Sequence, residues 1–193
     1  MPLAEQGAAT AGNPLLQARG LPAFDRIEAA HVGPALDQLL AAADAALELA
    51  VSDAVPADYG ALSKLLDVPV ERLGHAWSAV AHLNEVADTP ALRMAFNQGL
   101  PRVTDFHTRL GADERLYRKY RQIAASSSAQ DLCAAKRQAL QHSLRNFVLG
   151  GADLQGADRG RFAAIAERQA FLSQRFSENA LDAPDAFAYH ARP

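Results

Sequence analysis

Apolar residues that recur every three to four positions constrain the fold of this chain more than any other feature. In residues 34–51 the apolar side chains fall on one side of the predicted helix, and three acidic side chains fall on the other. The same spacing recurs along most of the chain, and no segment before Asp185 alternates as a strand does. The sequence therefore predicts an all-α fold, an irregular antiparallel helical bundle with short connections.

Start and stop signals divide this pattern into separate helices. A short helix is expected over 58–66, and Pro69 is expected to begin a longer one, because proline is tolerated in the first turn. Thr89 is the predicted N-cap of the next helix, which the segment Gly99-Leu100-Pro101 is expected to interrupt. Ser128 has capping-box spacing to Asp131.

The last predicted helix spans about residues 158–181. Its apolar stripe is expected to pack against the bundle, as the stripes of the other helices do. The side chains on that side of the helix are Phe162, Ile165, Ala166, Gln169, Leu172 and Phe176.

The two ends of the chain differ from this pattern. Residues 1–20 are small, polar and aperiodic, so this segment is predicted to be poorly ordered. Residues 21–183 form the predicted helical domain. Residues 184–193, with DAFAYHARP, alternate like a strand, but a strand without a partner cannot pair its backbone groups. We therefore interpret this tail as the truncated start of a strand.

Composition excludes several classes of protein. The chain has 193 residues and a net charge of −3, which gives no general attraction to nucleic acid or to an anionic membrane. One cysteine, Cys133, allows no internal disulfide and fits a reducing compartment. No run of about 18 apolar residues is present, so a transmembrane helix is not expected. The N-terminus does not resemble a signal peptide, and the cytoplasm is the expected location.

A polar seam on the helix that starts at Pro69 is the best candidate for a metal site. Its members are spaced four, three, four and three residues apart: Glu71, His75, Ser78, His82 and Glu85. The two histidines are about 10.5 Å apart along the axis, too far for two imidazoles on one zinc ion. A metal would therefore need either Glu71 with His75 or His82 with Glu85, plus ligands from another helix. The favoured interpretation is a seam that contacts solvent or a neighbouring helix.

Other candidates for chemistry are weaker. Cys133 is expected to be a buried, inert thiol. The basic run 115–122 could contact nucleic acid, but Leu116 and Tyr120 are expected in the core. HExxH, GxSxG and a glycine-rich phosphate loop do not occur. No catalytic, cofactor-binding or metal-binding residue is predicted in this chain. The basic side chains expected to face solvent are Arg118, Lys119 and Arg121.

Several segments in sequence order resemble the N-terminal region of the zinc oligopeptidases, the family of oligopeptidase A, thimet oligopeptidase and neurolysin. The likeness is closest to bacterial oligopeptidase A and covers nearly the whole chain from Asn13. The segments are NPLL, LPAFDRI, HVGPAL, HLNEVADTPALRMAF with LPRVTDF, LYRKYR, LRNFVLGGADL and QRFSENALDA.

The resemblance implies a function for the chain as part of a larger protein. Family members hold Zn²⁺ on an HExxH motif in a C-terminal catalytic domain and cleave short peptides inside a channel. Because HExxH is absent here, the resemblance implies a helical N-terminal channel wall that gates substrates, is inactive alone and binds no zinc. Its implied partners are the missing C-terminal catalytic domain and short peptides, with no nucleic acid and no membrane. HLNE is then a structural corner, and Thr89 caps the following helix.

Two alternatives remain open at this point. The chain could be a free-standing helical module that binds a partner protein through a helix groove, without catalysis. More remotely, Arg115 to Arg121 could bind nucleic acid.

Overall fold

The structure is a computed structural model that describes residues 12–17, 20–185 and 187. Within them six α-helices and three short 3-10 helices form an all-α fold, as predicted, and no strand is present. None of these helices is both long enough and apolar enough to span a bilayer. The elements are η1 (Pro14–Leu16), η2 (Phe24–Arg26), α2 (Ala29–Val51), α3 (Tyr59–Val86), α4 (Pro90–Gly111), α5 (Glu114–Ala125), η3 (Ser127–Ala129), α6 (Ala134–Leu149) and α7 (Ala157–Asp185).

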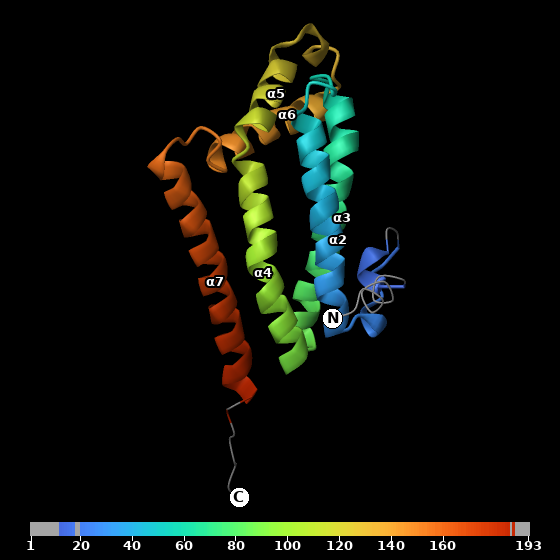
Figure 1. The fold of residues 1–193 in the computed structure, drawn as a ribbon, viewed down its shortest axis with the longest axis vertical. Coiled ribbons are helices and arrows are strands. Elements are labelled where there is room, and N and C mark those ends of the chain that lie inside the picture. Colours follow the sequence, from blue (N-terminus) through green and yellow to red (C-terminus); the bar gives the residue numbers. More distant parts are fainter. Residues whose placement is uncertain (1–11, 18–19, 186, 188–193) are drawn as a thin grey trace, which may run out of the picture.

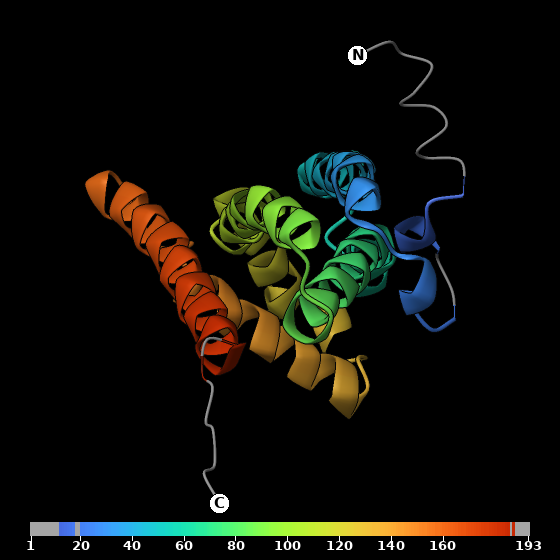
Figure 2. The same cartoon turned by 90° about the horizontal axis from the view of Figure 1, so that it is seen from below.

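Three long helices form the body of the molecule. Helices α2, α3 and α4 run side by side, and α5 and α6 lie at one end of this group (Figure 1). Helix α7 packs along α4 at the outer edge, on the side away from α2 (Figure 2). The last helix is therefore attached to the bundle mainly through one neighbour.

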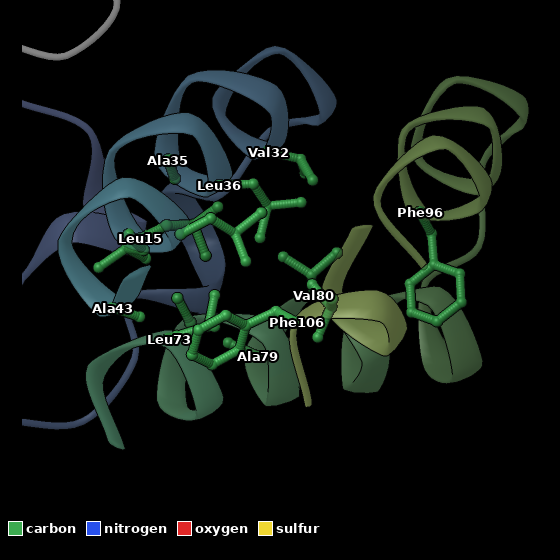
Figure 3. Packing of buried hydrophobic residues seen from close by; sticks show 14 of the residues in the cluster. Leu15, Val32, Ala35, Leu36, Ala43, Leu73, Ala79, Val80, Phe96 and Phe106 are labelled. Atoms are coloured by element: carbon green, nitrogen blue, oxygen red, sulfur yellow. The ribbon is translucent and has the colours of Figure 1, made fainter. Parts of the chain in front are cut away.

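Two clusters of buried apolar side chains stabilise the bundle. The first is formed by α2, α3, α4 and η1, with Phe106 of α4 fully buried among residues of the other helices (Figure 3). The second joins the other ends of α2 and α3 to α5 and α6. Leu66 belongs to the second cluster and Leu73 to the first, so α3 contributes to both.

Two predicted helix breaks are wrong. Helix α3 continues through Pro69, and α4 continues through Gly99-Leu100-Pro101. A proline inside a helix costs about 3 kcal/mol locally. The burial of apolar residues on both sides of each proline, such as Leu66 and Leu73 around Pro69, outweighs this local cost.

Helix starts also differ from the prediction. Helix α2 begins at Ala29, before Pro34, and the backbone N–H of Glu28 donates to Nδ1 of His31 at 3.0 Å. Helix α6 begins at Ala134, so the capping-box spacing of Ser128 and Asp131 does not mark the start of a helix. Cys133 occupies the cap position and is exposed, which corrects the expectation of a buried thiol. The side chain of His31 thus caps the start of α2, whereas Cys133 forms no side-chain capping hydrogen bond at the start of α6.

The two terminal segments are only partly described. Asn13 is buried, caps η1 and donates from Nδ2 to the carbonyl of His31 at 2.9 Å, and Leu15 enters the first cluster. Residues 13–16 thus pack against the bundle, which differs from the poorly ordered segment predicted over 1–20. Helix α7 extends through Pro184 to Asp185. The rest of the predicted strand, except Phe187, lies outside the described residues.

Candidate functional site

The polar seam of α3 faces solvent. Glu71, His75, Ser78, His82 and Glu85 are all exposed, and the ring of His82 lies 5.3 Å from the ring of Phe24, centroid to centroid. Among the residues that the structure describes, no three His, Cys, Asp or Glu side chains lie together as a metal site would require. The seam therefore acquires no ligands from a second helix.

The basic run on α5 does not form an uninterrupted cationic patch. Leu116 and Tyr120 are buried, as predicted, and Arg118 and Arg121 are exposed. Lys119 differs from the prediction, because its Nζ atom donates to backbone carbonyls at the end of α2. Nearby, Arg115 pairs with Glu48 and Asp113, whose acceptor oxygens each lie 2.7 Å from Nη2. Two of the four cationic side chains in this run, Arg115 and Lys119, thus bind acceptors of the same chain.

The HLNE segment forms a corner between α3 and α4. Asn84 is 3% exposed, and its Oδ1 has no hydrogen-bond partner among the described residues. Thr89 is the N-cap of α4, as predicted, and its Oγ1 accepts from the backbone N–H of Leu92 at 3.2 Å. Arg93 then binds Asp88, with Nε 2.9 Å from Oδ2. This arginine fixes the loop between the two helices.

Arg93 also joins the corner to the end of α7. Its two terminal nitrogens donate to the two carboxylate oxygens of Asp182 at 3.0 and 2.7 Å. Paired hydrogen bonds of this kind between charged groups fix orientation as well as distance. The Arg93 guanidinium lowers the pKa of the Asp182 carboxyl below its ordinary value.

Three further hydrogen bonds hold α7 against the body. Asn97 of α4 donates to Glu178 at 2.7 Å. At the other end, Arg159 donates to Glu114 at 2.7 Å and to the carbonyl of Ala112 at 3.3 Å. Polar pairs thus attach α7 near both of its ends.

A groove lies between α4 and α7, between these attachment points. It consists of three adjoining hollows of about 340, 630 and 520 Å³. The first two share Pro101, Thr104 and Glu167 in their walls, and the last two share residues including Asp105 and Ala163. We take this groove as the candidate functional site, because its three hollows adjoin one another between two packed helices.

The walls of the groove combine apolar surface with polar groups of both signs. Leu100, Pro101 and Phe171 supply apolar surface in the first hollow, where Gln174 and Glu178 supply polar groups. Amides can donate to and accept from a peptide backbone, whereas the apolar patches suit side chains. The arrangement is suited to binding an extended chain of mixed character.

The apolar stripe expected to bury α7 is covered only in part: Phe162 and Ala166 are half-buried, and Phe162 lines the third hollow of the groove. No side chain described in α7 is buried, and Ile165, Leu172 and Phe176 are 55%, 49% and 75% exposed. Groove-lining residues such as Asn97 and Gln174 were not identified from sequence, because single polar residues on helix surfaces carry no motif. The spacing pattern located the apolar stripe of α7, but it could not show which side meets α4.

Comparison with protein families assigns most of the chain to one family. The model of the neurolysin/thimet oligopeptidase N-terminal domain matches residues 36–159. This match includes the whole of α3, α4, α5 and α6.

Curated relatives agree with the family match. Oligopeptidase A of Salmonella typhimurium is 36% identical over 171 residues, which cover 89% of this chain and 25% of the relative. Oligopeptidase A of Escherichia coli is 34% identical, with the same two coverages. The probable cytosolic oligopeptidase A of Arabidopsis thaliana is 34% identical over 91% of this chain and 25% of the relative. The chain therefore spans about a quarter of the length of these relatives.

Proposed function

The chain belongs to the family of the neurolysin/thimet oligopeptidase N-terminal domain, and from this membership we propose that it is the helical, substrate-gating part of a zinc-dependent oligopeptidase. The parent protein hydrolyses short peptides in this proposal. The observation that carries it is the match to oligopeptidase A along 89% of this chain but only 25% of the relative. A segment with this coverage corresponds to one domain of a longer enzyme.

The proposal assigns a binding role and no catalytic role to the described residues. They do not fit a zinc ion, because no three candidate ligand side chains among them lie together. No catalytic step is therefore assigned to this chain, and the zinc ligands and the general base are proposed to lie in the remainder of the parent protein.

The groove between α4 and α7 supports the gating role. A wall that admits short peptides must offer weak contacts to many sequences, and mixed apolar and amide surface does this. In this proposal Asn97, Phe171 and Gln174 contact peptides that pass along the groove. The cytoplasm is the proposed location, supported by the name of the cytosolic relative.

Peptide hydrolysis tests the proposed function directly. The parent protein, expressed at the full length of the relatives, is expected to cleave a quenched fluorescent peptide of about ten residues. A chelator should abolish the cleavage, and added Zn²⁺ should restore it. The 193-residue chain alone should show neither cleavage nor stoichiometric zinc by metal analysis.

Two results would contradict the proposal. Chelator-sensitive cleavage by the 193-residue chain would place the active site in this chain. A parent protein that cleaves no peptide at any zinc concentration, yet binds another protein, would favour the alternative of a binding module without catalysis.

A further inference from the structure

Helix α7 has two different sides. Ala163, Glu167 and Gln174 face the groove and α4. Ile165 is two residues from both Ala163 and Glu167, and at 100° per residue it lies on the opposite side of the helix. Leu172 follows Ile165 by seven positions and Phe176 follows Leu172 by four, so these three side chains share one side. We call Ile165, Leu172 and Phe176 the outward face of α7.

The outward face is apolar and open to solvent. Its three side chains are between 49% and 75% exposed. In both views α7 lies at the edge of the molecule, with α4 on its inner side (Figures 1 and 2). Scattered apolar residues on a surface are ordinary, but a row at helical spacing on an edge helix marks an interaction surface.

A row of arginines borders the outward face. Arg161, Arg168 and Arg175 recur every seven residues, and the first two precede Ile165 and Leu172 by four positions. All three are exposed, and within the described residues none of them forms an ion pair. Arg175 lies at the boundary between the two sides, because it also lines the first hollow of the groove. Arg168 lies over the ring of Phe171, 5.2 Å from its centroid. An apolar seam with charges at heptad spacing beside it has the pattern of a helix that packs on a partner helix.

We propose that the outward face of α7 is the surface on which the remainder of the parent protein docks, through an apolar helix bordered by carboxylates that meet the three arginines. The proposal rests on the proposed function, since it takes the partner to be the rest of the same polypeptide. The relatives are about four times as long as their matched part, so a partner of sufficient size is present in every copy. Covalent attachment raises its effective concentration above that of a separate protein.

Cysteine labelling measures whether the outward face is covered. Leu172→Cys, the reporter substitution, is placed in a Cys133→Ser background, because Cys133 is itself exposed. Ala41→Cys in the same background is the matched control, since Ala41 is exposed on α2, across the bundle from α7 (Figure 2). Maleimide labelling is timed for the reporter thiol and the control thiol in the 193-residue chain and in the parent protein.

The expected result is that the reporter thiol labels at least tenfold more slowly in the parent protein than in the short chain, relative to the control thiol. Equal relative rates would overturn the proposal. Slow labelling in the short chain, together with a doubled mass by analytical ultracentrifugation, would make a second copy the occupant and would also overturn it.

Charge reversal on α7 tests whether carboxylates of the partner meet the arginines beside the outward face. Arg161→Glu with Arg168→Glu, in the parent protein carrying Leu172→Cys, is expected to speed labelling of the reporter thiol at least threefold. The control is Arg118→Glu with Arg145→Glu, which changes the net charge equally at exposed positions on α5 and α6. Unchanged labelling in the first variant would overturn the carboxylate border of the partner.

This experiment and the peptidase assay can fail separately. A parent protein that cleaves peptides but leaves the reporter thiol freely reactive would retain the proposed function and refute the docking surface. A parent protein that protects the reporter thiol but cleaves nothing would retain the docking surface and refute the proposed activity.

Discussion

The Nζ atom of Lys119 on α5 lies 2.7 Å from the carbonyl oxygen of Ala50, in the last turn of α2. The same ammonium group donates to the carbonyls of Ser52 at 2.6 Å and Val55 at 2.5 Å. The last carbonyls of a helix lack partners within it, and a cation near them is favoured by the helix dipole. One side chain therefore connects the end of α2 to α5.

Replacing this lysine should destabilise the fold. Lys119→Met keeps most of the length but removes all three donors, and we expect the free energy of unfolding to fall by about 1–3 kcal/mol. Arg118→Met, at the exposed neighbouring position, should change it by less than about 0.5 kcal/mol. Urea unfolding followed by circular dichroism measures both values, and similar losses in the two variants would contradict this role for Lys119.

Gly99 permits close contact between helices, in place of the helix break that its sequence context predicts. A Cβ atom at this position would lie 2.7 Å from Cδ1 of Leu36 and 2.8 Å from Cζ3 of Trp77. The ring of Trp77 is stacked on Phe96, with 4.6 Å between centroids, so it cannot shift without loss of that contact. Gly99→Ala should therefore destabilise the protein by about 1–3 kcal/mol.

Gly74 is the matched control for Gly99. It also lies inside a helix, but a Cβ atom there would meet nothing within 4 Å. Gly74→Ala should stabilise the protein by about 0.5–1 kcal/mol through the gain in helix propensity. Thermal unfolding of both variants checks the pair, and a stabilising Gly99→Ala would show that α2 and α3 do not approach α4 this closely.

The contact between Arg93 and Asp182 should be measurable through the pKa of Asp182. Its pKa lies below the ordinary value of 3.8 because of the hydrogen bonds from Arg93. The unfolded chain therefore takes up this proton more readily, so the stabilisation from the pair is present above about pH 3.8 and is lost as the pH falls through the lower folded pKa. In Arg93→Gln, NMR should show the Asp182 pKa raised towards 3.8.

Arg93→Lys serves as the control for charge alone. A lysine ammonium cannot form the paired contact of a guanidinium with both carboxylate oxygens. The pKa of Asp182 should then lie between the values in the wild type and in Arg93→Gln. An Asp182 pKa that is the same in all three proteins would show that α7 is not held to the corner by this contact.

Tyr120 should make the protein less stable at high pH. Burial raises the pKa of its phenol to about 12, with smaller contributions from Asp67 and Tyr59. The unfolded chain ionises near pH 10, so stability is complete below that pH and declines as the pH rises towards 12. Tyr120→Phe should show a smaller decline between pH 10 and 12 in urea unfolding. Parallel pH curves for the two proteins would contradict a buried phenol.

Periodicity identified most of the helical content because each helix buries apolar residues at its own period. Leu116 and Tyr120 on α5 were expected in the core and are buried there. The breaks at Pro69 and Gly99 were predicted wrongly, since local propensity acts over one turn whereas burial acts along the whole helix. Lys119 was misplaced because its carbonyl partners are far away in sequence.

The candidate site was less accessible from sequence than the fold. The spacing rules located the stripe of α7, and the corner at Thr89 followed from its capping chemistry. The groove itself depends on two helices that are separated by α5 and α6, and none of its residues forms a motif. To predict a groove between two helices that are far apart in sequence, one must know how those helices pack against each other.

The sequence by itself determined the class of fold, the family resemblance and the absence of HExxH, because each of these depends only on the order and spacing of residues along the chain. Only the tertiary structure decided that α7 turns a side of mixed polar and apolar residues to α4 and leaves Ile165, Leu172 and Phe176 open to solvent. The physical reason is that both sides of an amphipathic helix are present in its sequence, whereas the neighbour that each side meets depends on contacts such as that between Arg93 and Asp182, 89 residues apart.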